Sequence, residues 1–270
     1  MTSISKRFVL LFDFCGMFDF KLLRLNIFFS ILLLQLTASS AQVNMHEIPV
    51  LCYHQIHNWL TSDSKSARMY ILAPEKFRLQ MQLLADSGYH AITPDELLNY
   101  YDKNTELPSK PVLITFDDGT ASEFVNAVPI LKQYHFTAVF FIMTVALNKN
   151  FYMSSQQVKT LSDEGFAIGC HTWDHHDVRD YTNDDWAIQF QKPKQLLEKI
   201  TGKPVYYFAY PYGAWNNAAI EQLKVYKYKA AFQLTEKQSA SNSIYTIRRL
   251  LVDGNWNAQQ LLYAMHHAFK

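Results

Sequence analysis

Two adjacent carboxylates, Asp117 and Asp118, follow an apolar run over residues 111–116. Successive side chains on an extended strand point in opposite directions, so the two carboxylates can take different roles within one site. One could bind a metal ion while the other moves a proton. Because Gly119 comes next, the pair could instead form a turn whose Asp side chains cap the following helix.

Imidazoles stand at metal-ligand spacing after a second apolar run. His171 and His175 are four residues apart, and with one carboxylate they make a two-His, one-Asp set that leaves coordination positions open for water or substrate. His176 is an alternative second ligand, and a His pair at this spacing also occurs by chance on solvated surfaces. The carboxylates and imidazoles together predict a metal site, with zinc as the expected ion.

The elements around these residues alternate between short apolar runs and helical patterns, which is typical of βαβ units and a parallel sheet. Helices are expected at residues 74–87, from 94 onwards, at 122–134, 155–164 and 184–200, and after Asn257. Eight runs are expected to be strands: residues 48–53, 89–92, 111–116, 137–142, 166–169, 206–209, 230–234 and 247–252. The sequence therefore predicts the α/β class, and the number of strands favours a barrel.

Polar clusters follow three of these strands directly, at residues 117–119, 171–176 and 210–213. In a βα barrel the carboxyl ends of all parallel strands lie on one face. The three clusters are therefore expected to converge into one site.

The motifs TFDDG at residues 115–119 and HTWDH at residues 171–175 resemble the first two motifs of the NodB-type polysaccharide deacetylases, carbohydrate esterase family 4. VLCYH at residues 50–54 and FAYPYG at residues 208–213 extend the resemblance, and the latter is closest to the branch with this third motif. The resemblance implies a distorted (β/α) barrel of about seven to eight strands in a single NodB homology domain. It also implies a metal-dependent hydrolase that removes N-acetyl groups from an N-acetylglucosamine-containing polysaccharide.

Carried over position by position, the family pattern makes Asp117 the general base. The metal ligands are then Asp118, His171 and His175, and the expected ion is zinc. Water activated by the ion attacks the acetamide carbonyl while Asp117 takes the proton, and the backbone N–H of Tyr212 is expected to stabilise the oxyanion. Substrate contacts are expected from four further residues: His54, Trp173, Tyr210 and Pro211.

The third motif departs from the family pattern, because Ala209 stands where an Arg usually orients the base. An Arg from a later strand is expected to replace it, and Arg249 is favoured over Arg248. If residues 247–252 alternate on a strand, at least one of the two arginines is a solvated charge.

A clear fifth motif, whose His supplies the general acid in the family, is missing. His266 and His267 lie on the expected terminal helix, where exposed polar positions explain them, and His54 is a further candidate for the site. The general acid is therefore unassigned. The alternatives on the same fold are an O-acetyl esterase and a carbohydrate-binding protein that has lost turnover.

The N-terminal segment has the order of a secretory signal. Lys21 and Arg24 precede an apolar run at residues 25–36, and small residues follow. We expect a signal peptide over residues 1–41 and a deacetylase domain over residues 42–270, hence a secreted or periplasmic protein. The lesser alternative is a protein tethered to the membrane by an uncleaved signal.

Composition narrows the choice of partners. A net charge of +1 over 270 residues gives no basic field for a phosphate backbone, so nucleic acid is not an expected partner. The expected partner is an N-acetylated polysaccharide substrate, and the sequence indicates no stable protein partner. Cys52 and Cys170 are expected to be buried and unpaired.

Overall fold

The structure is a computed structural model that describes residues 47–234 and 236–269 of the 270-residue chain. The expected signal peptide at residues 1–41 lies outside the described residues. Within the described part, no helix is long and apolar enough to cross a membrane.

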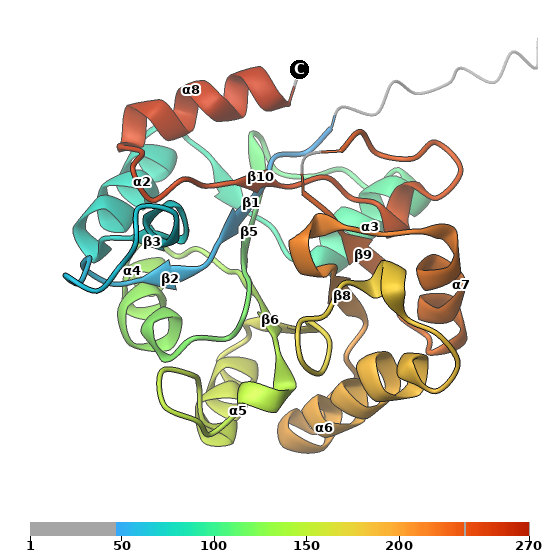
Figure 1. The fold of residues 1–270 in the computed structure, drawn as a ribbon. Helices are drawn as coiled ribbons and strands as arrows, with labels where there is room; N and C mark the ends of the chain where they lie inside the picture. Colours follow the sequence, from blue (N-terminus) through green and yellow to red (C-terminus); the bar gives the residue numbers. More distant parts are fainter. Residues whose placement is uncertain (1–46, 235, 270) are drawn as a thin grey trace, which may run out of the picture. The chain divides into compact units, whose positions relative to one another are not determined.

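A curled sheet of parallel strands forms the centre of the fold (Figure 1). The strands follow one another in the order β10-β1-β5-β6-β7-β8-β9, and β4 pairs with the start of β5. A separate small sheet joins β2 and β3. The strands are β1 Val50–Tyr53, β2 Gln55–Ile56, β3 Ile71–Leu72, β4 His90–Ala91, β5 Pro111–Phe116, β6 Val139–Ile142, β7 Ala167–Cys170, β8 Tyr207–Ala209, β9 Ala230–Phe232 and β10 Leu250–Leu251. The predicted α/β class and distorted barrel are confirmed.

Residues 247–252 connect the two edges of the curled sheet. At the start of this segment, Ile247 pairs with the end of β9. At its end, β10 pairs with β1, and the Val252 N–H donates to the Cys52 carbonyl at 2.9 Å. Arg249 lies between these two sets of pairs, so its position depends on the alignment of both edges.

Helices surround the strands (Figure 1). The α-helices are α2 Pro74–Asp86, α3 Pro94–Lys103, α4 Val128–Gln133, α5 Ser155–Asp163, α6 Lys192–Thr201, α7 Asn217–Val225 and α8 Ala258–Ala268. Short 3-10 turns are η1 Ala67–Tyr70, η3 Thr144–Ala146, η4 Val178–Asp180, η6 Pro211–Gly213 and η7 Ser243–Tyr245. Two π-helices, η2 Glu123–Ala127 and η5 Ala187–Gln191, lead directly into α4 and α6. The helices predicted at residues 122–134 and 184–200 therefore each contain a π-helical turn near their start.

Local capping signals set the predicted starts of two helices. Thr93 caps α3 in a capping box with Glu96, whose backbone N–H donates to Thr93 Oγ1 at 3.2 Å. Asn257 caps α8 in the same way with Gln260. Such caps satisfy N–H groups that lack partners in the first helical turn, and each contributes about 1 kcal/mol.

Some parts of the fold were not predicted from the sequence. The helix α7 begins at the cap Asn216 and buries Ile220 and Leu223, a weak version of the usual helical pattern. β2 and β3 have two residues each, too few for alternation to be recognised. β10 covers only two residues of the strand expected at residues 247–252, because that segment changes its partner from β9 to β1.

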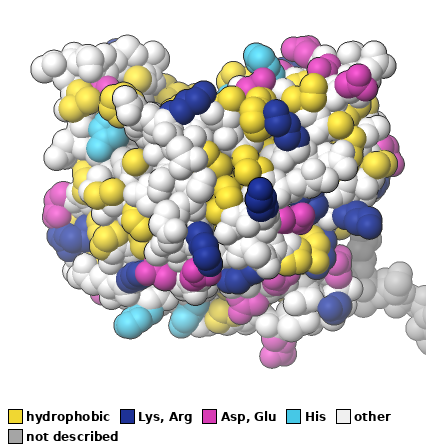
Figure 2. All heavy atoms as spheres, turned by 90° about the horizontal axis from the view of Figure 1, so that it is seen from below, with side chains coloured by type: hydrophobic (Ala, Val, Ile, Leu, Met, Phe, Trp, Pro, Cys, Tyr) yellow, Lys and Arg dark blue, Asp and Glu magenta, His cyan; other side chains and the backbone are white. Residues whose placement is uncertain are grey.

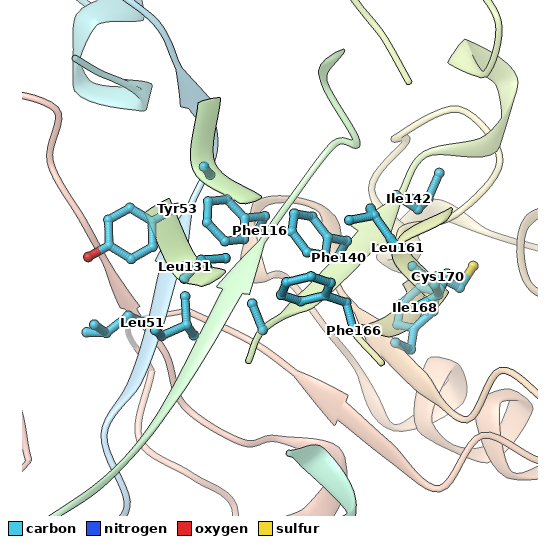
Figure 3. Close-up of a cluster of buried hydrophobic side chains, with 14 of the residues drawn as sticks. Leu51, Tyr53, Phe116, Leu131, Phe140, Ile142, Leu161, Phe166, Ile168 and Cys170 are labelled. Atoms are coloured by element: carbon cyan, nitrogen blue, oxygen red, sulfur yellow. The ribbon is translucent and has the colours of Figure 1, made fainter. Parts of the chain in front are cut away.

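Alternation along the strands builds two separate cores. Phe116 on β5 packs with helix residues in one cluster, whereas Leu113 on the same strand belongs to a second cluster between the strands. In the first cluster, Phe116 and Phe140 stack with ring centroids 4.9 Å apart, and Phe166 meets Phe140 edge to face (Figure 3). The same alternation points Asp117 towards the interior between the strands.

The outer face over α5 and α6 carries charges of both signs. Figure 2 shows this face, with acidic and basic side chains interspersed among hydrophobic ones. This mixture agrees with the net charge of +1 and gives no broad area of one sign on this face.

Candidate active site

Three loops meet at the carboxyl ends of the strands. The Asp loop, residues 117–120, follows β5; the His loop, residues 171–176, follows β7; and the third loop, residues 210–214, follows β8. Tyr212 of the third loop meets the His175 ring edge to face, with centroids 4.7 Å apart. The parallel order of the sheet brings these loops together, because all carboxyl ends lie on one side.

Asp118, His171 and His175 present three ligand atoms to one point. Asp118 Oδ1 lies 3.6 Å from the Nε2 atoms of both histidines, and all three atoms lie within 4.8 Å of one another. A tetrahedral ion with bonds of about 2.1 Å would hold its ligand atoms about 3.4 Å apart, so the observed spacing fits such an ion. Two imidazoles and one carboxylate suit zinc or another borderline divalent cation.

His171 is prepared for a metal by its second nitrogen. The ring is buried, and its Nδ1 lies 2.8 Å from the carbonyl oxygen of Ala209. Because a carbonyl only accepts hydrogen bonds, Nδ1 carries the proton and Nε2 turns its lone pair towards Asp118. Burial lowers the pKa of His171 and keeps the ring neutral. Ala209 therefore contributes to the site through its backbone.

Asp117 is held in a buried bidentate ion pair. Arg249 Nη1 and Nη2 donate to Asp117 Oδ1 and Oδ2 at 2.6 and 2.7 Å. Arg249 is itself fixed by Thr115 Oγ1 at 3.2 Å and by the Gln233 carbonyl at 3.1 Å. Burial alone would raise the pKa of Asp117, but the Arg249 guanidinium outweighs it and holds that pKa well below its usual range. Asp117 is therefore ionised and fixed in orientation.

The two neighbouring arginines have different partners. Arg248 Nε donates to Glu47 Oε1 at 2.7 Å, away from the Asp loop. Arg249 is 1% exposed and reaches Asp117. The alternation of a strand thus sends one arginine inward and one outward.

The two neighbouring histidines are also separated. His176 is an exposed side chain, and its Nδ1 faces Asp174 Oδ1 at 3.1 Å. His175 instead lies against Asp118, as described above. The geometry therefore offers His175, and not His176, to a metal ion.

Several residues of these loops have a strained backbone. Left-handed conformations occur at Asp118 (φ 79°), Thr172 (φ 65°), His175 (φ 66°) and Tyr212 (φ 60°). Each such conformation at a residue other than glycine costs about 1–3 kcal/mol and typically persists at functional sites. One local compensation is the His175 N–H, which donates to Thr172 Oγ1 at 2.9 Å. Gly213 is required in the third loop, because a Cβ there would lie 2.6 Å from the Leu234 nitrogen.

Two buried side chains from the π-helices hold the Asp loop and the His loop. Glu123 Oε1 accepts from the Thr120 N–H and hydroxyl at 2.8 and 2.9 Å. Gln189 Oε1 accepts from the Trp173 N–H at 3.1 Å, and its Nε2 donates to Asp174 Oδ1 at 2.8 Å. π-Helical turns are rare and frequent at functional sites. The spacing of Thr120 and Glu123 matches a capping box and could have indicated this role, whereas no sequence pattern marks Gln189.

The expected oxyanion donor Tyr212 and the residues expected to contact substrate differ in exposure. Tyr212 is 67% exposed, but Tyr210 is completely buried and Pro211 is buried beside it. Since a sugar cannot stack on a ring without exposed surface, the Tyr210 ring is not the substrate contact expected from the sequence: it supports the third loop from the core. Trp173 is half-buried, and Lys192 Nζ lies 3.4 Å from its ring centroid.

His54 follows β1 and adds an imidazole beside Asp117. Its ring meets Tyr70 edge to face, and its buried Nδ1 has no hydrogen-bond partner among the described residues. Cys52, His54 and Asp117 each offer one ligand atom, and these three atoms lie within 4.8 Å of one another. Burial lowers the pKa of His54.

The thiols of Cys52 and Cys170 are both free and buried, so the prediction that they do not pair is confirmed.

His266 and His267 have other contacts on α8. His266 Nε2 lies 3.3 Å from the Tyr89 hydroxyl, and His267 stacks on Tyr263 with centroids 3.8 Å apart. Neither contact involves the three loops, so the geometry does not offer these histidines as the general acid.

The fold and the site together define a barrel enzyme, with its polar groups at the carboxyl ends of the strands. A family model described as polysaccharide deacetylase matches residues 104–232, which include all three loops. Over these residues the chain is therefore similar to the polysaccharide deacetylase family. The predicted enzyme class is confirmed at this level.

Individual relatives agree with this family. The poly-beta-1,6-N-acetyl-D-glucosamine N-deacetylase of Staphylococcus epidermidis is 29% identical over 211 residues, which are 73% of this chain and 73% of that protein. The structure of Streptococcus pyogenes deacetylase PplD in complex with acetate has a TM-score of 0.75 at 27% identity, covering 81% of this chain and 97% of that one. The structure of IcaB from Ammonifex degensii has a TM-score of 0.69 at 27% identity, covering 82% of this chain and 98% of that one. This fold is shared over most of the described residues.

Proposed function

We propose that the protein is a metal-dependent N-deacetylase acting on an N-acetylglucosamine-containing polysaccharide. The observation that carries the proposal is the set of three metal-ligand side chains directly beside Asp117, which Arg249 keeps ionised. The name of the Staphylococcus epidermidis relative supports the substrate class. The proposed ion is zinc, because two imidazoles and one carboxylate are donors of zinc hydrolases.

Asp117 is the proposed general base. A divalent ion held by Asp118, His171 and His175 would lower the pKa of a bound water from 15.7 towards about 7. Asp117 Oδ2 lies 4.0 Å from His171 Nε2, so the carboxylate is beside the ligand set and can take the proton as water attacks the acetamide carbonyl. Arg249 binds both carboxylate oxygens and prevents the side chain from turning away.

His54 and Tyr212 complete the proposed machinery. A neutral His54 beside Asp117 can accept the proton and pass it to the leaving amine, and its buried Nδ1 is not committed to another described group. The backbone N–H of Tyr212, in the turn beside His175, donates to the oxyanion in this scheme. Loss of such a donor commonly costs roughly 3–4 kcal/mol.

Acetate release from N-acetylglucosamine oligomers tests the proposal. We expect release by the purified chain that stops after chelation and returns with added zinc or cobalt. The control His176→Ala changes an imidazole outside the ligand set and should keep this behaviour. Release from O-acetyl esters alone would point to an esterase, and tight metal binding without any release would point to a carbohydrate-binding protein.

We also propose that the protein is exported and loses residues 1–41. The support is the charged start at Lys21 and Arg24 followed by the apolar run at residues 25–36. N-terminal sequencing of the exported protein should begin at Gln42. An intact N-terminus in the membrane fraction would indicate a tether instead.

A further inference from the structure

A groove of about 730 Å³ lies next to the Asp loop. Its walls come from β2 and the residues after it, from the first residue of α2, from residues 120–122 before η2 together with Asn126, and from the segment that contains Phe151 and Tyr152. Several of its residues are far apart in the sequence, including Gln55, Ser122 and Phe151. The groove is therefore a product of the tertiary fold.

Backbone hydrogen bonds join this groove to the catalytic loop. The Ala121 N–H donates to the Phe151 carbonyl at 2.8 Å, and the Met153 N–H donates to the Gly119 carbonyl at 2.9 Å. Gly119 directly follows Asp118, one of the three candidate metal ligands. A polymer held at Asp118 thus has the groove as its continuation on this side.

The groove has no charged side chain of Asp, Glu, Lys or Arg among the residues that line it, although 18% of the chain is charged. Its polar side chains carry amides, hydroxyls and one imidazole: Gln55, His57, Asn58, Thr120, Ser122, Asn126 and Tyr152. A second groove around Trp59, by contrast, is lined by Lys65, Arg68 and Asp253. The groove beside the Asp loop therefore differs from this second groove in having no Asp, Glu, Lys or Arg side chain on its walls.

Two apolar side chains at this groove are left open to solvent. Phe151 is 84% exposed and has a left-handed backbone with φ of 70°. The backbone of Phe151 is fixed by its hydrogen bond to the Asp-loop side of the groove, while its ring is free to contact a ligand. Leu60 is 55% exposed on the same groove. Strain combined with an exposed aromatic ring is typical of a binding surface.

We propose that this groove binds neutral, N-acetylated sugar units next to the unit that is deacetylated. The inference rests on the proposed function and deepens it by adding a preference for the neighbouring units. Amides and hydroxyls can pair with the acetamido and hydroxyl groups of such units, and Phe151 can stack on the apolar face of a sugar ring. A protonated glucosamine would lose water around its ammonium group without finding a carboxylate, so it binds less well.

This preference has a consequence for the product. A unit that has lost its acetyl group carries a positive charge, and its transfer into the groove is disfavoured. The enzyme therefore favours stretches whose units on the groove side are still acetylated. Deacetylated units on that side slow the next reaction.

Oligomers of defined acetylation test the proposal with the zinc-loaded full-length protein. Wild type should release acetate more slowly from an oligomer with one glucosamine on the groove side than from the fully acetylated oligomer. Phe151→Ala should raise KM for long oligomers roughly threefold to tenfold, as expected for loss of one stacking contact, with an effect that grows with length. Equal rates on both oligomers together with an unchanged KM in Phe151→Ala would overturn the proposal.

A charge substitution provides the matched control. Leu60→Asp adds a carboxylate to the groove and should narrow the difference in acetate-release rate between the two oligomers. Leu79→Asp adds the same charge on α2, outside this groove, and should leave that difference unchanged. A narrowing in both variants would overturn the assignment to this groove. Acetate release from the fully acetylated oligomer is the separate readout for the proposed function. If no acetate is released, the proposed chemistry is wrong; if release occurs without any effect of length or of the neighbouring glucosamine, only the groove assignment is wrong.

Discussion

The Asp loop and the His loop carry the two parts of the metal-ligand set, and each is held by one buried side chain from a π-helix. Glu123 accepts two hydrogen bonds at Oε1, while its Oε2 has no partner among the described residues. Gln189 uses both ends of its amide, one as acceptor and one as donor. The two side chains have similar roles, but an amide is neutral at every pH, whereas a buried carboxyl must keep its proton.

This difference makes the support of the Asp loop sensitive to pH. Burial raises the pKa of Glu123 well above its ordinary value of 4.5. In the unfolded chain Glu123 ionises near that ordinary value, but in the folded protein it stays protonated. Its contribution to stability is therefore fully present below pH 4.5 and is lost as the pH rises towards the folded pKa.

The largest effects are expected inside the Asp loop, between its adjacent carboxylates. Asp118→Ala removes a metal ligand, so bound metal and turnover should both be lost. Asp117→Asn leaves the ligand set intact, so metal should remain while kcat falls by about 10²- to 10⁴-fold, the usual range for a lost general base. Metal content and kcat measured on the same preparations separate the two cases. A near-normal rate in Asp117→Asn would contradict the base assignment.

The next effect concerns the ion pair that fixes the Asp loop from the barrel interior. Arg249→Met leaves Asp117 buried without its partner and should lower the free energy of unfolding by about 3–5 kcal/mol. Urea unfolding at pH 7 measures this loss. The double variant Asp117→Asn, Arg249→Met removes both charges and should recover much of it. A single variant as stable as wild type would show that this pair does not hold the loop.

Smaller effects, similar in size for the two loops, are expected when Glu123 or Gln189 is replaced. Glu123→Ala and Gln189→Ala should each weaken zinc binding by about 10- to 100-fold, the range for residues that orient metal ligands. Zinc titration of the metal-free protein measures both affinities, with the exposed Gln259→Ala on α8 as a control. If only one variant loses affinity, the two loops are not held by equivalent devices.

The smallest effect is expected in the pH dependence of stability, which distinguishes the carboxyl of Glu123 from the amide of Gln189. Glu123→Gln keeps the hydrogen-bond acceptor but cannot ionise. Between pH 5 and pH 8 the free energy of unfolding of this variant should therefore fall less than that of wild type, by a difference on the order of 1 kcal/mol. Gln189→Glu makes the reverse exchange and should add a similar pH dependence to the His loop. Urea unfolding of all three proteins at both pH values tests this. Parallel pH profiles would show that Glu123 is not the sensitive group.

Local patterns in the sequence were sufficient for much of the fold. The apolar runs predicted all eight strands of the curled sheet, and capping residues such as Thr93 and Asn257 predicted helix starts. These features depend on neighbouring residues, because strand alternation and helix caps are short-range. The motifs around Asp117 and His171 also indicated a resemblance to polysaccharide deacetylases, and the family model that matches residues 104–232 agrees with it.

The tertiary structure decided which side chain of each candidate pair faces the site. Arg249 lies 132 residues from Asp117 in the chain, and it reaches the carboxylate because residues 247–252 bridge β9 and β1 in one register. A shift by one residue would send Arg248 inward instead. His175 was likewise separated from His176 by a left-handed turn that the spacing of the histidines does not encode.

The sequence by itself determined the chemical groups of this protein and the strands that carry them, because these follow from residue type and short-range periodicity. Only the tertiary structure decided their surroundings: the burial of Tyr210, the supports Glu123 and Gln189, and the neutral groove at Phe151. Burial and hydrogen bonding between distant segments depend on how the whole sheet curls and closes, which no local pattern specifies.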